Sequence, residues 1–144
     1  MPHWLRSPII TLGIVAAGCG GSLDPPGQQL SVGNVTSPTE FVLAIGGEVK
    51  VDAQLRIGFR SVPSDSRCPS SVTCVWAGDG AAEIAYGTGT GPLHPDTLHT
   101  ALDPKQVEFG GYLIKLLELN PYPSTPAGIR QEDYRLRLRV ERRP

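Results

Sequence analysis

The sequence predicts an all-β domain after an N-terminal signal segment and a flexible tether. The expected architecture is an antiparallel β-sandwich or a partly open barrel of about 7–8 short strands. Apolar and polar residues alternate along much of the chain after Glu40, as in half-buried strands. The chain contains 17 Gly and 14 Pro in 144 residues, against a usual combined share of about 12%. Charged residues make up only 19%, which argues against a helical bundle or coiled coil.

Residues 1–18 are typical of an export signal. The apolar run at residues 9–17 is too short to cross a hydrocarbon core of about 30 Å as a helix. It leads into Ala16-Ala17-Gly18-Cys19, and small residues before a single Cys resemble the lipobox of bacterial lipoproteins. The resemblance implies cleavage after Gly18 and a diacylglycerol on Cys19. The alternative is an ordinary secretory signal in which Cys19 is incidental.

Residues 19–38 are predicted to be the lipidated Cys and a flexible linker. The segment is rich in Gly, Pro and Ser, so it cannot bury enough apolar surface to offset the entropy of ordering it. An edge strand near residues 30–35 is the alternative. Gly20 after the Cys resembles an outer-membrane sorting signal. We therefore expect a cell-envelope protein anchored by lipid, in the outer membrane if the cell has two membranes.

Residues 39–144 are predicted to form a single β domain, whose strands follow in order. Residues 41–45 alternate, and Gly46-Gly47 predicts a hairpin turn into a strand at residues 49–51. Along the next strand Leu55, Ile57 and Phe59 share one face, opposite Arg56 and Arg60. Further strands are expected at residues 75–76, 81–86, 97–102, 107–109 and 112–119. The prolines in residues 120–123 end the last of these, and residues 128–133 predict one helical turn.

The final strand has the clearest alternation, and its residues are predicted to divide between two faces. The core face is expected to carry Tyr134, Leu136, Leu138 and Val140, and the outer face Arg135, Arg137 and Arg139. This arginine stripe has two interpretations. It is a solvated face with cross-strand carboxylates such as Glu118, or a surface that contacts anionic lipid, cell-wall polymer or an acidic partner.

The chain contains three cysteines. If Cys19 carries lipid, Cys68 and Cys74 remain, and the count closes as one disulfide. Such a bond persists in the oxidising compartment that an exported protein enters. It would close a small loop and staple it locally.

The two cysteines lie in the densest motif, Asp65-Ser66-Arg67-Cys68-Pro69 followed by Cys74-Val75-Trp76-Ala77-Gly78. The motif resembles a segment of small bacterial envelope lipoproteins, in which D-S-R-C-P precedes C-V/I-W-A-G. The resemblance extends to Ile129 and Asp133-Tyr134, and it implies an all-β envelope domain without implying an activity. One interpretation is a structural corner, with Trp76 packed near the bridge and Asp65 bonded to turn amides or paired with Arg67. The other is a ligand surface that includes Asp65, Arg67 and Trp76.

The sequence also offers residues for a metal site and a glycine-rich segment to weigh as a phosphate site. His94 and His99, with a carboxylate such as Asp96, offer ligands for a metal, and an extracytoplasmic metal-binding protein is the alternative function. Pro92 rather than a helix follows the glycines at residues 87–91, which favours a hairpin tip over a phosphate site.

Nucleic acid is not an expected partner, because the net charge is −1 and no aromatics interleave the arginine stripe. No G-x-S-x-G, H-E-x-x-H or C-x-x-C-H motif occurs, so no catalytic residue and no cofactor are predicted. The prediction is a membrane-anchored, non-enzymatic envelope lipoprotein whose β domain binds or scaffolds, with the membrane and an envelope protein or polymer as partners.

Overall fold

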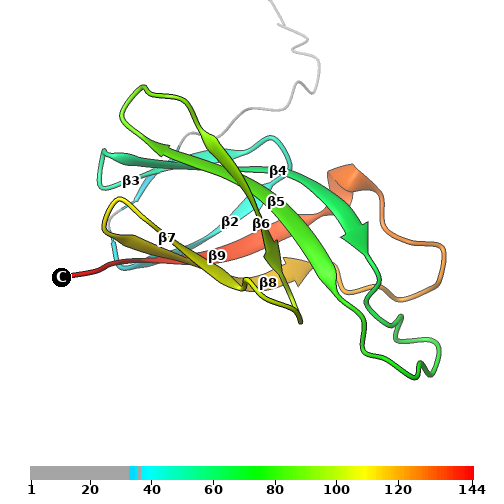
Figure 1. Ribbon diagram of the computed structural model, residues 1–144. Helices are drawn as coiled ribbons and strands as arrows, with labels where there is room; N and C mark the ends of the chain where they lie inside the picture. The colour runs from blue at the N-terminus through cyan, green and yellow to red at the C-terminus, as the bar shows by residue number, and fades with distance from the viewer. Residues whose placement is uncertain (1–32, 36) are drawn as a thin grey trace, which may run out of the picture.

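The structure is a computed structural model that describes residues 33–35 and 37–144. Its described residues form nine strands and one 3-10 turn (Figure 1). In chain order they are β1 (Gly33–Val35), β2 (Thr39–Ala44), β3 (Glu48–Val51), β4 (Leu55–Asp65), β5 (Gly80–Thr88), β6 (His94–His99), β7 (Gln106–Phe109), β8 (Tyr112–Asn120), η1 (Gln131–Asp133) and β9 (Arg135–Arg142). The predicted signal peptide and Cys19 lie outside the described residues. Among those described, no helix is long and apolar enough to cross a membrane.

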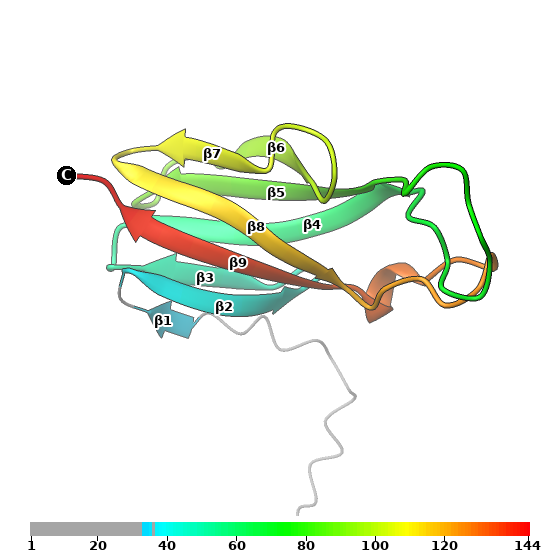
Figure 2. The same ribbon diagram turned by 90° about the horizontal axis from the view of Figure 1, so that it is seen from below.

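Two sheets pack face to face, as Figures 1 and 2 show. One has the strand order β1-β3-β4-β5-β6, and the other has the order β2-β9-β8-β7. Neighbouring strands are antiparallel except for β1, which pairs with β3 in parallel. The all-β prediction is confirmed, and the sandwich is the architecture that forms. Strands β2 to β9 match the predicted number, and β1 adds an edge strand.

The core lies between the sheets and follows the predicted alternation. In β4 the side chains of Leu55, Ile57 and Phe59 are fully buried, whereas Arg60 is exposed. Burial also alternates strictly from Arg135 to Val140 in β9, with the aliphatic residues inside and the arginines outside. The predicted faces of both strands are therefore confirmed. Since alternate side chains of a strand point to opposite faces, one buried position determines the others.

The turn at Gly46-Gly47 differs from the prediction. We expected a hairpin, but β2 pairs with β9 and β3 pairs with β4, so this turn carries the chain from one sheet to the other. Its ends are held by β4: the Gly46 amide donates to the Phe59 carbonyl at 2.8 Å, and the Phe59 amide donates to the Gly47 carbonyl at 3.0 Å. The hairpin prediction was wrong because alternation identifies the buried face of a strand without identifying its neighbour.

Three other strand predictions change. No strand forms at residues 75–76, which lie in the loop between β4 and β5. The strand expected at residues 97–102 is β6, which ends at His99, because Ala101 and Leu102 donate their amides to the Asp79 carboxylate and turn the chain. Part of the predicted linker forms β1, so the edge-strand alternative holds for those residues.

The remaining local predictions are confirmed. Residues 87–91 include the end of β5 and the tip of its hairpin with β6. The Gly110-Gly111 pair joins β7 to β8, with positive φ values of 56° and 79°. Strand β8 ends at Asn120, before the prolines, and the predicted helical turn is the short η1. These features depend on a few adjacent residues, so local sequence is sufficient to predict them.

Candidate binding surface at the disulfide loop

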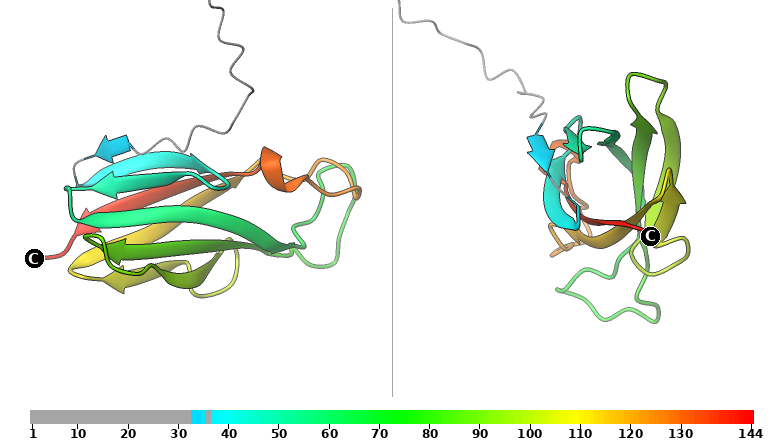
Figure 3. Two further views of the ribbon diagram at one scale, coloured as in Figure 1. Left: turned by 90° about the horizontal axis from the view of Figure 1, so that it is seen from above. Right: turned by 90° about the vertical axis from the view of Figure 1, so that its left-hand side faces the viewer.

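The disulfide loop, residues 66–79, connects β4 to β5 at one end of the sandwich (Figure 3). Backbone bonds hold its base. Ser66 donates to the Asp79 carbonyl at 2.7 Å, and Cys68 donates to the Ala77 carbonyl at 2.9 Å. The predicted disulfide between Cys68 and Cys74 is confirmed, with a Cα–Cα distance of 5.9 Å. The loop is therefore stapled both at its base and within its span.

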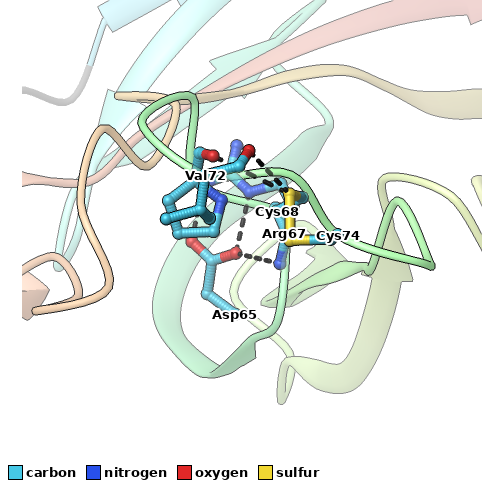
Figure 4. The surroundings of a disulfide bond; sticks show 6 residues. Asp65, Arg67, Cys68, Val72 and Cys74 are labelled. Atoms are coloured by element: carbon cyan, nitrogen blue, oxygen red, sulfur yellow. Dashed lines mark hydrogen bonds and ion pairs between the residues drawn. A yellow bond between two sulfur atoms is a disulfide. The ribbon is translucent and has the colours of Figure 1, made fainter.

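Arg67 anchors this loop to the domain, and only 7% of the residue is exposed. Its Nε and Nη2 donate to the two carboxylate oxygens of Asp65 at 2.8 and 2.6 Å (Figure 4). The same guanidinium donates to the carbonyls of Leu119 at 2.5 Å and Pro121 at 3.0 Å. Of the two interpretations of Asp65 and Arg67, the ion pair within a structural corner holds and the ligand surface does not, because their charged groups lie inside the domain and are paired with each other. They hold the loop and offer little to a partner.

The Asp65 carboxylate has a second side-chain partner, Tyr134, whose hydroxyl donates to Oδ2 at 2.9 Å. Burial opposes ionisation of Asp65, but hydrogen bonds from Arg67 and Tyr134 outweigh it, so the pKa of the carboxyl is lowered. Burial, followed by the hydrogen bond to Asp65, raises the pKa of Tyr134 to about 12. The carboxylate and the neutral phenol therefore keep their protonation states around neutral pH.

Gly78, the last residue of the motif, and Asp79, which follows it, shape the loop. Gly78 has a φ of +72°, and a Cβ at this position would lie 1.8 Å from the Ser66 carbonyl oxygen, so only glycine fits. The buried Asp79 accepts the Ala101 amide at 2.8 Å, and its other oxygen lies 2.6 Å from His99 Nδ1. Burial opposes ionisation of Asp79, but these bonds prevail and lower its pKa. Both residues therefore serve the fold.

Trp76 does not pack near the disulfide as predicted. Residues 70–77 are all exposed, and the exposed fractions are 82% for Trp76, 91% for Val75 and 45% for Val72. The predicted packing was wrong because it assumed that Cys74 and Trp76 lie on one strand. These residues lie instead in the irregular loop between β4 and β5, where Cys74 closes the small disulfide ring. The loop thus presents an indole and two aliphatic side chains to solvent.

A second loop, between β8 and η1, lies against the first. The Ser70 amide donates to the Pro123 carbonyl at 3.0 Å, and the Arg67 guanidinium carbon lies 5.2 Å from the centroid of the Tyr122 ring. Tyr122 is 54% exposed. We refer to residues 68–78 and 120–129 together as the uncharged cap, since neither segment contains Asp, Glu, Lys or Arg.

The sequence reasoning missed three exposed residues of this cap, Val72, Val75 and Tyr122. It assigned Val75 to a strand and treated Tyr122 only as a neighbour of helix- and strand-breaking prolines. The available signal was the absence of charge along both segments of a chain that is 19% charged overall. That signal acquires meaning only when the fold places the two segments together.

The predicted metal ligands are not brought together. His94 and His99 occupy the two ends of β6; five positions apart, they lie on opposite faces and about 17 Å apart along the strand. His94 packs against Phe109, with ring centroids 5.5 Å apart, and Asp96 accepts the Tyr86 hydroxyl at 3.0 Å. Within residues 33–35 and 37–144, no three His, Cys, Asp or Glu side chains are grouped to hold a metal ion.

The arginine stripe is exposed, as predicted, and its charges have partners. Arg137 lies 2.7 Å from Glu40 on β2, and Arg139 lies 2.5 Å from Glu141 on its own strand. Arg135 donates to the carbonyls of Glu132 and Tyr134, each at 2.8 Å. Glu118, the partner suggested by the sequence, is opposite Arg137 in the backbone register, but Glu40 makes the ion pair. This pattern favours a solvated face over an anion-binding surface.

The chain matches no protein-family model, no curated protein and no solved structure. The fold and the cap alone therefore define its class, which is a β-sandwich domain that displays exposed apolar side chains on a disulfide-stapled loop.

The disulfide gives a direct stability test. Replacing Cys68 and Cys74 together with Ser is expected to lower the free energy of unfolding by about 2 kcal/mol, because the unfolded chain regains the entropy of a small closed loop. Urea denaturation measures the change. Reductant should destabilise the parent protein by the same amount and leave the double variant unaffected. Equal stability of the two proteins without reductant would show that backbone bonds, rather than the bridge, hold the loop.

Proposed function

We propose that this protein is a membrane-anchored, non-enzymatic lipoprotein of the cell envelope whose β-sandwich acts as a binding domain through the uncharged cap. The observation that carries this proposal is the exposure of Val75 and Trp76, at 91% and 82%, on a loop whose base is tightly held. Rigid loops that expose large apolar side chains are typical of binding surfaces.

The other residues of the motif support this assignment by contrast. Asp65 and Arg67 form the buried ion pair, Cys68 and Cys74 form the bridge, and Gly78 permits the close backbone approach. Val75 and Trp76 make no comparable contribution to the fold, and their exposure leaves apolar surface in water. Because the loop is already ordered, a partner would lose little additional conformational entropy on binding.

The anchor is inferred from Ala16-Ala17-Gly18-Cys19, which resembles a lipobox. Acyl chains on Cys19 would hold the domain at a membrane, because each buried CH₂ contributes about 0.8 kcal/mol. Thirteen residues, numbers 20–32, separate Cys19 from β1. Gly20 after the Cys supports outer-membrane sorting in a cell with two membranes. We propose no cofactor and no catalytic residue.

The anchor is tested by replacing Cys19 with Ser in the full chain expressed in a bacterial host. The variant is expected to leave the membrane fraction, because Ser cannot form the thioether to diacylglycerol. The matched control is Ser22→Ala, which changes a neighbouring hydroxyl and should remain in the membrane fraction. A membrane-bound Cys19→Ser protein, together with a parent protein that carries no lipid by mass spectrometry, would overturn the proposal.

A further inference from the structure

We infer that the uncharged cap inserts into the interface of the same lipid bilayer that holds Cys19, so that the domain rests on the membrane by this end. The inference depends on the proposed lipid anchor and deepens it, because it names a lipid surface as the partner of the cap.

The chemistry of the cap fits a bilayer interface. Its exposed large side chains are Val72, Val75, Trp76 and Tyr122. Trp and Tyr prefer the headgroup level of a membrane, since their rings are apolar and one end can donate a hydrogen bond. Aliphatic side chains beside them can enter the acyl region. The cap has no charged residue that would lose hydration on insertion, and the nearby Asp65–Arg67 pair is already buried.

The described chain enters the domain from the side of the cap. Strand β4 runs toward the disulfide loop, β3 runs away from it, and β1 is parallel to β3. Gly33, the first residue of β1, is therefore the end of that strand nearer to the cap, and the chain enters the domain from that side. Strand β9 leads the other way, and Figure 2 shows the C-terminus at the end of the sandwich remote from the disulfide loop.

The linker is long enough for the anchor and the cap to reach one surface. Gly33 lies level with Val49, which pairs with Ile57, eight residues before the end of β4. Those eight residues cover about 26 Å. The chain from Cys19 to Gly33 can span at most about 48 Å. Anchoring also keeps the cap at a high effective concentration near lipid, so weak insertion is sufficient.

The protein has a native probe for this contact. The chain contains two tryptophans, Trp4 and Trp76, and Trp4 belongs to the predicted signal peptide, so the mature lipoprotein retains Trp76 alone. The purified lipidated protein is reconstituted into phosphatidylcholine vesicles. We expect the emission of Trp76 to shift to shorter wavelength than in detergent-free Cys19→Ser protein that also carries Trp4→Phe, so that Trp76 is the only tryptophan in both samples. Phosphatidylcholine brominated on its acyl chains should reduce its intensity about twofold, because an interfacial indole touches those chains.

A matched pair of variants tests the role of the loop. Val75→Ser should weaken the quenching of Trp76 without altering the fold, since Val75 is 91% exposed. The control Val42→Ser changes another exposed valine, 58% exposed on β2 and outside the cap, and should leave the quenching unchanged. Equal effects of the two substitutions would contradict insertion through the cap.

Sedimentation of the vesicles separates the two proposals. If the protein sediments with the vesicles while Trp76 emits as in water, the lipid anchor is supported and insertion of the cap is overturned. Protein that carries no lipid and fails to sediment overturns the anchor, and with it this inference. A blue shift that requires a purified envelope protein in addition to lipid would identify a protein surface as the partner and would also overturn insertion.

Discussion

Arg67→Ala is expected to lower the free energy of unfolding by about 3–5 kcal/mol, because it removes one partner from a buried ion pair and leaves the other charge uncompensated. The Asp65 side chain is only 9% exposed, so water solvates its carboxylate poorly. The substitution also removes the donors to the carbonyls of Leu119 and Pro121. Urea denaturation at neutral pH measures the loss.

The matched control for this prediction is Arg130→Ala. Arg130 also donates twice to a nearby carboxylate, that of Asp133, but its side chain is 73% exposed. Exposed ion pairs contribute little because water solvates both charges, so the expected change is at most about 0.5 kcal/mol. Similar losses for Arg67→Ala and Arg130→Ala would show that burial does not account for the contribution of the Asp65–Arg67 pair to stability.

The same ion pair predicts a dependence of stability on pH. The folded-state pKa of Asp65 is lowered, below an unfolded value of about 3.9. The ionised carboxylate therefore stabilises the fold fully above about pH 4, and this contribution is lost as the pH falls through the folded pKa. In Arg67→Ala the side-chain hydrogen bonds of the guanidinium are gone, so the pKa of Asp65 is higher than in the parent protein. The parent protein loses the stabilisation by the ion pair on acidification, whereas the variant has already lost it, so the difference in unfolding free energy between the two should shrink as the pH falls from neutral to about 3. Urea denaturation at several pH values measures this difference, and a difference that stays constant with pH would contradict the prediction.

Leu138→Ala is expected to lower the free energy of unfolding by about 2–5 kcal/mol, because it removes a fully buried side chain and leaves a cavity in the core. Leu138 sits in β9, between Phe41 of β2 and Leu116 of β8 in the backbone register. Two neighbouring strands therefore limit how far the site can collapse. Thermal or urea denaturation of the full chain measures the loss.

The adjacent residue supplies the control for the core prediction. Arg137→Ala removes a side chain from the outer face of the same strand, where that side chain is 48% exposed and pairs with Glu40. The expected change is within about 0.5 kcal/mol. If Arg137→Ala were as destabilising as Leu138→Ala, the outer ion pairs rather than the core would hold β9 in place.

The sequence was sufficient for features that depend on neighbouring residues. The alternation in β4 and β9 predicted which side chains are buried, because the strand geometry ties each residue to the next. Strands β7 and β8 form where their short apolar runs predicted them, at residues 107–109 and 112–119. The bridge between Cys68 and Cys74 followed from the count of cysteines. Each prediction required only a short stretch of chain or simple arithmetic.

The candidate site was only partly predictable. Trp76 was identified as a candidate binding residue, but the sequence suggested that it packs near the disulfide, and it lies exposed. Tyr122 was not considered, since 46 positions separate it from Trp76 and only the fold brings their loops together. His94 and His99 have a suitable spacing for metal ligands, yet β6 sends them to opposite faces. Spacing along the chain defines a site only when the intervening structure is known.

Local chemistry by itself determined an all-β chain, the buried faces of its clearest strands, its turns and its disulfide, because these arise within a few residues or from composition. Tertiary structure alone decided that Gly46-Gly47 joins two sheets, that Arg67 is buried, and that two uncharged loops form one cap. The alternation in β9 already predicted that Arg137 is solvated, whereas nothing in the residues beside Arg67 indicates burial. Arg67 is buried because residues distant in sequence lie against its guanidinium, among them Leu119 and Pro121, whose carbonyls accept its hydrogen bonds.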